Sequence, residues 1–377
     1  MTEFKEYTLG NICSRLSSGK GIPASQVRES GPYPVYGGNG LRGYTDHSNF
    51  AGECAIIGRQ GAFCGNVRYF SGEAYMTEHA VVTCANAEHN TRYLAYLLST
   101  MNLGRLSGQS AQPGLSVKTL SAQTVSLPSK DIQNAVVSIL ASLDEKIAIN
   151  ERINDNLLQQ ALAIFTSWFI RFDQFSGIKP DDWETTSLDN LCSLISRGIT
   201  PKYDDASDQI VINQKCIRNH MLDLLPARRH RPKVVNEKWL RYGDLLINST
   251  GEGTLGRSAQ VYFEPYNMTV DSHVTIVRPA QKHLIFYVGM WGLLHEREIE
   301  ALHTGSTGQT ELPRERLKSM EILLPDRDTL IHFDESISPL AQMIVRNQRE
   351  NIRLASLRDS LLPRLMSGEI DVSGISL

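Results

Sequence analysis

The side chains of this chain that could do chemistry are polar and lie in stretches rich in Gly, Ser and Asn, which are typical of turns and exposed loops. Arg, Lys, Gln, Asn and Ser hold phosphates and hydrogen-bond to base edges, so these loops are candidates for nucleic-acid contact. In the first part of the chain the candidates are Lys20, Asn39, Arg42, Arg59, Gln60, Arg68, Gln109, Ser110 and Gln112. Further along they are Lys202, Lys215, Arg228, Arg229, Arg231, Lys233, Ser249, Thr250, Arg257, Ser306, Thr307 and Gln309. The alternative is that loops are polar in any soluble protein, and it is weakest for ARRHRPK from Ala227, where basic residues flank His230.

No arrangement typical of a catalytic site accompanies these loop residues. The string GRQGAFCG from Gly58 has the glycines of a phosphate-binding loop but lacks the Lys and Ser or Thr that should follow. The sequence also lacks the Asn/Asp-Pro-Pro-aromatic motif of amino-methyltransferases and the Asp with a downstream Glu-x-Lys of nucleases. His79 and His273 lie in strand-like sequence, which favours hydrogen-bonded core histidines over catalytic bases. The sequence therefore predicts a non-catalytic protein with no cofactor.

Length and composition favour a soluble protein of two domains. The 377 residues exceed a typical single core, and 41% of them are hydrophobic and 21% charged. Without an export signal or an apolar run of the roughly 18 residues that span a bilayer, we expect a cytoplasmic protein with no membrane partner. Six cysteines without a CxxC pair predict reduced, mostly buried thiols and no metal site. The net charge of −3 argues only weakly against a nucleic-acid partner, since residues 1–130 hold 11 Lys and Arg against 8 Asp and Glu.

The chain carries an internal repeat of about 180 residues. GQSAQPGLSVKTLSAQTVSLP from Gly108 resembles GSTGQTELPRERLKSMEILLP from Gly305. In the same order, TLGNICSRLSSG from Thr8 matches SLDNLCSLISRG from Ser187 at an offset of 179 residues, and GECAIIGRQGAFCGNVRYF from Gly52 matches GDLLINSTGEGTLGRSAQVYF from Gly243 at 191. The offset is 194 between His79 and His273, and it stays at 197 from Gln112 and Gln309 onward. An ordered series of matches indicates duplication of one unit.

Each repeat ends in a segment with the periodicity of a long amphipathic helix. In the first, apolar residues recur at three- and four-residue steps from Ile132 to Trp168, apart from one six-residue step that Asn150 fills, and Ser129 is expected as the N-cap. In the second they run from Phe333 to Leu365, and Pro339 is expected to kink the helix or to mark its first turn, with Ser338 as the cap. A helix of about 40 residues is about 60 Å long. The constant offset over these segments fits a packed seam, which cannot absorb an insertion.

Two long amphipathic helices in one chain are expected to pack against each other. Asn150 and Asn347 then lie on or beside the seam, where a buried Asn fixes register, or alternatively at its boundary in contact with solvent. The helix residues that we expect to contact partner proteins are Asn150, Asn154, Trp168, Asn347, Asn351 and Leu361.

The remaining segments, residues 1–128 and 173–326, mix short strands with helices. Expected strands are ECAIIG, HAVVTC, DLLINS and HVTIVRP, and expected helices are TRYLAYLLSTM and the apolar, buried LIFYVGMWGLL from Leu284. The predicted fold class is α/β: two globular domains separated by two long helices, at 129–172 and 327–377, that pack as an antiparallel coiled coil and give the chain a pseudo-two-fold repeat.

With these features the chain resembles the specificity (S) subunits of Type I restriction-modification enzymes. The resemblance rests on YPVYGGNGLRGY from Tyr33, on GQSAQPGLS, on LDEKIAINERIN from Leu143 followed by AIFTSWFIRF, and on LRDSLLPRLMSGEIDV from Leu357. Together they cover essentially the whole chain, and the two helix-end strings are the most specific. The second domain departs from the pattern, since it has no recognisable YPVYGGNG and its GSTGQTELP lacks the Pro-Gly of the first copy.

The resemblance implies a non-catalytic subunit of a larger complex. Residues 1–128 and 173–326 are then target-recognition domains, and each binds one half of a bipartite site on double-stranded DNA. The helices dock two methyltransferase (modification) subunits, and motor-nuclease (restriction) subunits join for cleavage. Two alternatives remain open. A self-contained enzyme would need one of the missing motifs, and a coiled-coil scaffold would read no DNA, which the basic cluster argues against.

Overall fold

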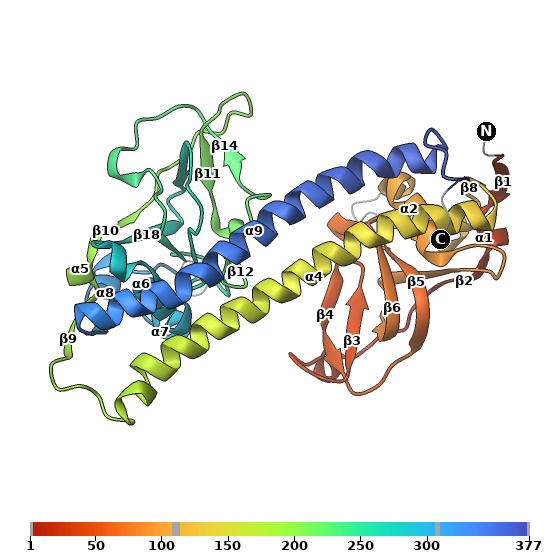
Figure 1. The fold of residues 1–377 in the computed structure, drawn as a ribbon. Helices are drawn as coiled ribbons and strands as arrows, with labels where there is room; N and C mark the ends of the chain where they lie inside the picture. The colour runs from red at the N-terminus through yellow and green to blue at the C-terminus, as the bar shows by residue number, and fades with distance from the viewer. Residues whose placement is uncertain (1–2, 108–113, 306–309, 375–377) are drawn as a thin grey trace. The chain divides into compact units, whose positions relative to one another are not determined.

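The computed structural model describes residues 3–107, 114–305 and 310–374 (Figure 1). Six of the expected DNA contacts lie outside the described residues: Gln109, Ser110, Gln112, Ser306, Thr307 and Gln309. The elements form two compact units. Unit 1 is Met1–Ala148 with Asn351–Leu377, and unit 2 is Ile149–Glu350. Both mix helices with β-sheet, in agreement with the expected α/β class. None of the helices described is both long enough and apolar enough to cross a membrane.

Within the described residues, unit 1 is built on a six-stranded sheet of order β2-β7-β5-β6-β3-β4 and a separate β1-β8 pair. Neighbouring strands are antiparallel, except that β3 and β6 are parallel. The strands are β1 (Lys5–Thr8), β2 (Cys13–Ser18), β3 (Tyr33–Gly37), β4 (Gly40–Thr45), β5 (Phe50–Gly58), β6 (Val67–Met76), β7 (Ala80–Ala85) and β8 (Thr124–Leu127). The helices are α1 (Leu9–Ile12), α2 (Thr91–Thr100), α3 (Val117–Ser121) and the first part of α4 (Lys130–Phe169). The expected strands ECAIIG and HAVVTC and the expected helix TRYLAYLLSTM are confirmed as parts of β5, β7 and α2.

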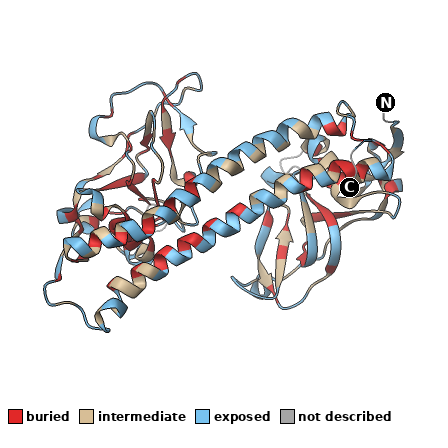
Figure 2. Cartoon of the chain, viewed as in Figure 1, coloured by how far each residue is buried: buried red, intermediate tan, exposed pale blue. Residues whose placement is uncertain are grey.

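The central strands of unit 1 are buried on both faces because β-branched and small apolar residues follow one another along them. Ile57 and Val81 point into a core that includes Leu94 of α2, whereas Ile56 and Val82 point into a smaller core on the opposite face. Figure 2 shows buried segments in the strands of this sheet, beside half-buried and exposed ones. The sheet therefore holds the turns at its ends on a rigid base.

Unit 2 contains a four-stranded sheet of order β10-β18-β15-β16, a three-stranded sheet of order β14-β11-β17 and the pairs β12-β13 and β9-β19, among the residues described. The strands are β9 (Glu184–Ser187), β10 (Cys192–Arg197), β11 (Ile210–Ile212), β12 (Ile217–Arg218), β13 (Met221–Leu222), β14 (Arg228–Arg229), β15 (Leu245–Asn248), β16 (Ser258–Gln260), β17 (Met268–Val270), β18 (Val274–Pro279) and β19 (Glu321–Leu324). The helices are α5 (Leu188–Leu191), α6 (Ile285–Leu294), α7 (Glu296–Ala301), α8 (Arg314–Lys318) and most of α9 (Arg327–Met366). The expected strands DLLINS and HVTIVRP are confirmed as β15 and β18.

The apolar string LIFYVGMWGLL forms α6, and the prediction that it is a buried helix is confirmed. A helix that is apolar on all sides must be enclosed on all sides. Side chains at Gly289 and Gly292 would collide with Gln260 of β16 and Leu245 of β15, so the two glycines let the helix lie close to the sheet.

The two units share one strand topology. The order β10-β18-β15-β16 repeats β2-β7-β5-β6, and β11 runs parallel to β17 as β3 runs parallel to β6. An antiparallel partner follows in each unit, β4 beside β3 and β14 beside β11. A short turn joins β3 to β4, whereas residues 213–227 separate β11 from β14. That insertion explains why the counterpart of YPVYGGNG is unrecognisable in the sequence.

The helices α4 and α9 each run for 40 residues, as their periodicity predicts. Ser129 directly precedes α4, and its carbonyl accepts a 3.0 Å hydrogen bond from Gln133 N. The expectation that Pro339 marks the first turn of the second helix is wrong, because α9 begins at Arg327. Its cap is Asp326, whose carboxylate accepts hydrogen bonds from Thr329 N (2.9 Å) and Oγ1 (2.6 Å). The expected cap Ser338 lies inside the helix.

Within each unit, segments of α4 and α9 pack in antiparallel directions. In unit 1, Arg358 Nη1 donates to Asp144 Oδ1 at 2.9 Å and Asn351 Nδ2 donates to the Ile147 carbonyl at 3.4 Å. In unit 2, Asn150 Nδ2 donates to Glu350 Oε2 at 2.7 Å, and Asn347 Nδ2 donates to Asn154 Oδ1 at 2.8 Å. Asn150 and Asn154 are 1% and 4% exposed. Asn150 therefore lies on the seam rather than at a solvated boundary.

Candidate nucleic-acid interface

In unit 1, the loop after β5 lies beside the turn between β6 and β7. Gln60 follows β5, and its Oε1 lies 3.1 Å from Nδ1 of His79 in that turn. Arg59 N donates to the His79 carbonyl at 3.0 Å, and the Arg59 carbonyl accepts from Leu115 N at 2.9 Å. The chain that follows residues 108–113 therefore runs beside Arg59 and Gln60, two of the expected contacts.

The turn between β3 and β4 joins the same edge of the unit 1 sheet. A side chain at Gly38 would collide with the His79 carbonyl, so only glycine allows this close approach. Arg68 Nη2 donates to the Asn39 carbonyl at 3.4 Å. The structure thus brings Asn39, Arg59, Gln60 and Arg68 together. Lys20 and Arg42 are exposed, and Lys20 N donates to the Met76 carbonyl just before the β6-β7 turn.

Unit 2 has a polar cluster at the corresponding edge of its sheet. Thr250 follows β15, and its Oγ1 lies 2.9 Å from Nδ1 of His273 in the turn between β17 and β18. Gln214 Nε2 donates to Thr250 Oγ1 at 3.0 Å and also to the Thr250 carbonyl. The Ser249 carbonyl accepts from Leu312 N at 2.8 Å, so the chain that follows residues 306–309 runs beside this loop. Thr250 and Gln214 are half-buried and His273 is exposed.

The remaining unit 2 candidates differ in exposure. Lys202, Lys215 and Arg257 are exposed. Ser249 is fully buried, and its hydroxyl forms hydrogen bonds with Thr275 Oγ1 at 2.5 Å and with the Ile247 carbonyl. The expectation that Ser249 contacts DNA is therefore wrong, because its side chain is spent inside the sheet.

The structure also corrects the alignment of the two repeats by one residue. Gly58 pairs with Ala80 in unit 1 as Asn248 pairs with Val274 in unit 2. Gln60 consequently corresponds to Thr250, and not to Gly251 as the offset of 191 implied. Isolated bridges agree, since Gln60 bridges to Gly114 and Thr250 bridges to Glu311. Both corresponding residues contact the corresponding histidine.

The cluster Arg228, Arg229, Arg231 and Lys233 lies on and after β14, and all four side chains are exposed. The Arg228 guanidinium stacks on Tyr203, 3.5 Å from the ring centroid, and Arg231 Nε lies 3.7 Å from Asp204 Oδ2. His230 is 1% exposed. Burial and the nearby Lys233 lower the pKa of His230. A backbone hydrogen bond at Arg231 raises it by less, so the pKa lies below its usual value. The charge of this surface therefore comes from Arg and Lys, with a neutral His beneath.

The expected partner contacts are mostly used inside the chain. Asn150, Asn154, Asn347 and Asn351 hydrogen-bond between α4 and α9 as described above. Trp168 and Leu361 pack against the cores of units 2 and 1. These residues hold the helices together, and their contact with partners stays a prediction. The large apolar side chains that the helices do expose are Ile149, Ile153, Met343, Ile352 and Leu357.

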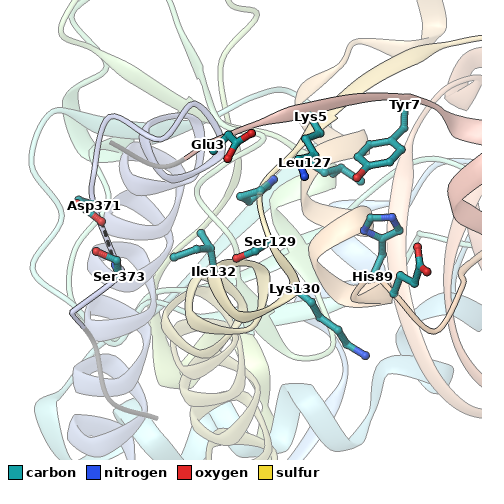
Figure 3. A pocket seen from close by; sticks show the side chains of 12 residues that line it. Glu3, Lys5, Tyr7, His89, Leu127, Ser129, Lys130, Ile132, Asp371 and Ser373 are labelled. Atoms are coloured by element: carbon teal, nitrogen blue, oxygen red, sulfur yellow. Dashed lines mark hydrogen bonds between the residues drawn. The ribbon is translucent and has the colours of Figure 1, made fainter.

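A separate pocket of about 450 Å³ lies in unit 1 near the start of α4 (Figure 3). Tyr7 meets the ring of His89 edge-on in its wall, and burial lowers the pKa of His89. The charged lining residues are Glu3, Lys5, Glu88, Lys130 and Asp371. Because carboxylates outnumber ammonium groups there, the pocket is a poor match for a phosphate backbone.

Two histidines of the interface were misassigned from the sequence. His79 and His273 are not core residues: each lies in a turn, half-buried or exposed, beside a candidate contact. The sequence signal that could have placed them at the interface was their correspondence in the repeat.

Cys54 and Cys216 are buried and the other four cysteines are half-buried, all as free thiols. Burial raises the pKa of Cys54 to about 12, so the thiol stays protonated and unreactive.

The sequence is similar to proteins of known family. Residues 1–159 match the family model of the type I restriction modification DNA specificity domain. The type I restriction enzyme EcoprrI specificity subunit of Escherichia coli is 40% identical over 146 residues, which are 38% of this chain and 36% of that protein. This match therefore spans little more than a third of that relative. The MjaIX specificity subunit of Methanocaldococcus jannaschii is 26% identical over 313 residues, which are 75% of this chain and 69% of that protein.

A solved structure shows the same fold. The crystal structure of the type I restriction-modification system S subunit from M. genitalium matches with a TM-score of 0.58 at 15% sequence identity, over 97% of this chain and 96% of that chain. Family model, relatives and sequence motifs agree: the chain is similar to type I restriction-modification specificity subunits, and its residues 1–159 match their DNA specificity domain.

Proposed function

We propose that this chain is the non-catalytic subunit that reads a bipartite target on double-stranded DNA in the cytoplasm. The target-recognition domains are residues 1–128 and 173–326, and the helical segments 129–172 and 327–377 act as spacers between them. The observation that carries the proposal is the repeated edge of the two sheets, where a turn histidine and a loop side chain meet in the same way in both units. Two copies of one binding edge suit two half-sites, and their linkage raises the combined affinity.

Partner subunits supply the chemistry in this proposal. Two methyltransferase subunits dock on the helices, and motor-nuclease subunits join for cleavage. The exposed Ile149, Ile153 and Met343 of unit 2 support docking on the helices, because large apolar side chains at a surface favour protein contact. A scaffold that reads no DNA is the alternative, and the exposed cluster from Arg228 to Lys233 favours DNA contact over it.

The direct test is to map methylated adenines in the genome of a host that carries this chain and its methyltransferase. We expect one motif with two specified parts separated by an unspecified gap. A motif with a single part would contradict bipartite reading, and methylation that persists when the methyltransferase is omitted would contradict a non-catalytic chain.

A paired insertion tests the helices as spacers. Four residues placed after Ala148 of α4 and four after Glu350 of α9 leave the hydrogen bonds of each unit intact, because both sites fall at the unit boundaries. Each insertion lengthens its helix by about 6 Å. The gap should grow by about two base pairs at about 3.4 Å each, with both half-sites unchanged. An unchanged gap in an active complex would show that the helices do not set the spacing.

A further inference from the structure

The turn histidines of the two units are held by one scheme. The backbone N–H of His79 donates to Thr77 Oγ1 at 3.4 Å, and the backbone N–H of His273 donates to Asp271 Oδ1 at 2.9 Å. Their carbonyls accept from the residues that follow β5 and β15, Arg59 N at 3.0 Å and Ser249 N at 2.8 Å. The backbone of each histidine is therefore held at the edge of its sheet, next to the loop that also meets the chain after residues 108–113 or 306–309.

In unit 2, the hydrogen-bond chain sets which ring nitrogen of His273 carries the proton. Gln214 Nε2 can only donate, so Thr250 Oγ1 accepts from it. The Thr250 hydroxyl proton is then free to point at His273 Nδ1, 2.9 Å away, which acts as the acceptor. A neutral imidazole with Nδ1 as acceptor keeps its proton on Nε2. His273 is exposed, so this N–H is a fixed donor offered to a ligand.

In unit 1, the roles of the corresponding residues are exchanged. Gln60 Oε1, 3.1 Å from His79 Nδ1, can only accept, so Nδ1 is the donor of this pair. Glu78 Oε1 lies 3.1 Å from His79 Nε2, and the ring serves both acceptors when it carries both protons. The amide oxygen of Gln60 is thus occupied, and its Nε2 protons are left to point outward. Gln60 is exposed, so unit 1 also offers an N–H donor at this position.

We propose that Gln60 in unit 1 and His273 in unit 2 each donate a hydrogen bond to an acceptor on a base edge in the major groove. The acceptors of matching chemistry are purine N7, guanine O6 and thymine O4. His79, Thr250 and Gln214 are positioning residues that hold the two donors in place. The inference rests on the proposed function and names the residues that read one base in each half-site.

The test maps the methylated motif for His273→Ala, Thr250→Val and Gln60→Ala chains, each co-produced with the methyltransferase. His273→Ala should lower the preference at one base position of one half-site by about ten-fold or more, and Gln60→Ala should do so in the other half-site only. Thr250→Val keeps the side-chain shape but removes the hydroxyl, so it should relax the same position as His273→Ala by less. Each unit is the matched control for the other.

A further control is Glu88→Ala, because this exposed side chain follows the end of β7 that lies away from the β6-β7 turn. It should leave the motif unchanged. An unchanged motif in the His273→Ala and Gln60→Ala complexes would overturn the inference, and so would equal weakening at all sequences, which is the behaviour of phosphate contacts. Absence of any two-part motif with the unaltered chain would instead refute the proposed function, so the two failures are distinct.

Discussion

The two units have different side chains at one corresponding position of their two sheets. In unit 1, Cys54 of β5 lies across from Cys84 of β7, one step along the register from Ala55 and Thr83. In unit 2, Leu245 of β15 pairs with Val277 of β18. The next residues along the two strands, Asp244 and Arg278, therefore lie across from each other. One unit therefore has a buried and a half-buried thiol where the other buries an ion pair.

The ion pair of unit 2 anchors a segment that unit 1 lacks. Arg278 Nε and Nη2 donate to the two oxygens of Asp244, each at 2.7 Å, and the guanidinium also donates to the carbonyls of Glu237 (2.8 Å) and Trp239 (2.6 Å). These carbonyls belong to the chain between β14 and β15. In unit 1, the corresponding connection between β4 and β5 is only residues 46–49, so it has no such segment to anchor. A shared fold thus accommodates an insertion by turning a core position into a clamp.

Removing the clamp gives the largest expected difference between the units. Asp244→Ala leaves the Arg278 charge buried and unpaired, which should cost about 3–5 kcal/mol of unfolding free energy. Cys54→Ala removes only a small apolar group and should cost about 1 kcal/mol. Thermal unfolding followed by calorimetry measures both changes. Equal losses for the two variants would mean that Asp244 and Arg278 do not anchor the insertion.

The elements were readable from the sequence because their patterns are local. The apolar runs of β5 and β18, the all-apolar α6 and the two 40-residue helices follow from side-chain periodicity alone. The helical segment 327–377 was placed from the sequence, but its cap was not. Pro339 suggested Ser338, whereas the capping role of Asp326 depends on its carboxylate reaching Thr329. Asn150 could be placed on the seam only once its partner Glu350 was known.

The candidate site was less predictable, for a physical reason. A gap in a glycine-rich loop can be placed at several positions without changing the match, so Gln60 and Thr250 were misaligned by one residue. That single step decides whether a side chain points into the sheet or out of it, as buried Ser249 and half-buried Thr250 show. The residues that surround His79 and His273 come from segments distant in sequence, which no local pattern links.

The two units are expected to differ in how strongly they hold DNA phosphates, because the basic cluster occurs only in unit 2. Unit 2 has Arg228, Arg229 and Arg231 on and beside β14, whereas the corresponding β4 of unit 1 has only Arg42. If these side chains hold phosphates, changing all three to Ala should lower the slope of log K against log salt by about 2.7, against about 0.9 for Arg42→Ala. Titration of the assembled complex with target DNA at several salt concentrations measures the slope. Arg297→Ala on α7 is the exposed control, and an unchanged slope for the triple variant would remove the cluster from the interface.

The smallest expected difference lies at the two helix starts, Ser129 of α4 and Asp326 of α9, which correspond in the repeat. Burial of the Asp326 carboxyl raises its pKa, but hydrogen bonds from Thr329 and Trp183 outweigh this and hold the pKa below its usual value. A lowered folded-state pKa means that the stabilisation is complete above the unfolded value of about 3.9 and is lost as the pH falls through the folded value.

Asp326→Ala should therefore cost about 1 kcal/mol at pH 7, the usual contribution of an N-cap, and progressively less below about pH 4. Ser129 is exposed and its side chain takes part in none of the hydrogen bonds described, so Ser129→Ala should cost at most about 0.5 kcal/mol with no such pH dependence. Urea unfolding of both variants and the unaltered chain at several pH values measures the difference. Because the cap of α9 belongs to unit 2, the Asp326→Ala loss should appear in the unfolding of that unit. A pH-independent cost for Asp326→Ala would mean that the hydrogen bonds to Thr329 and Trp183 do not depend on the charge of the carboxylate.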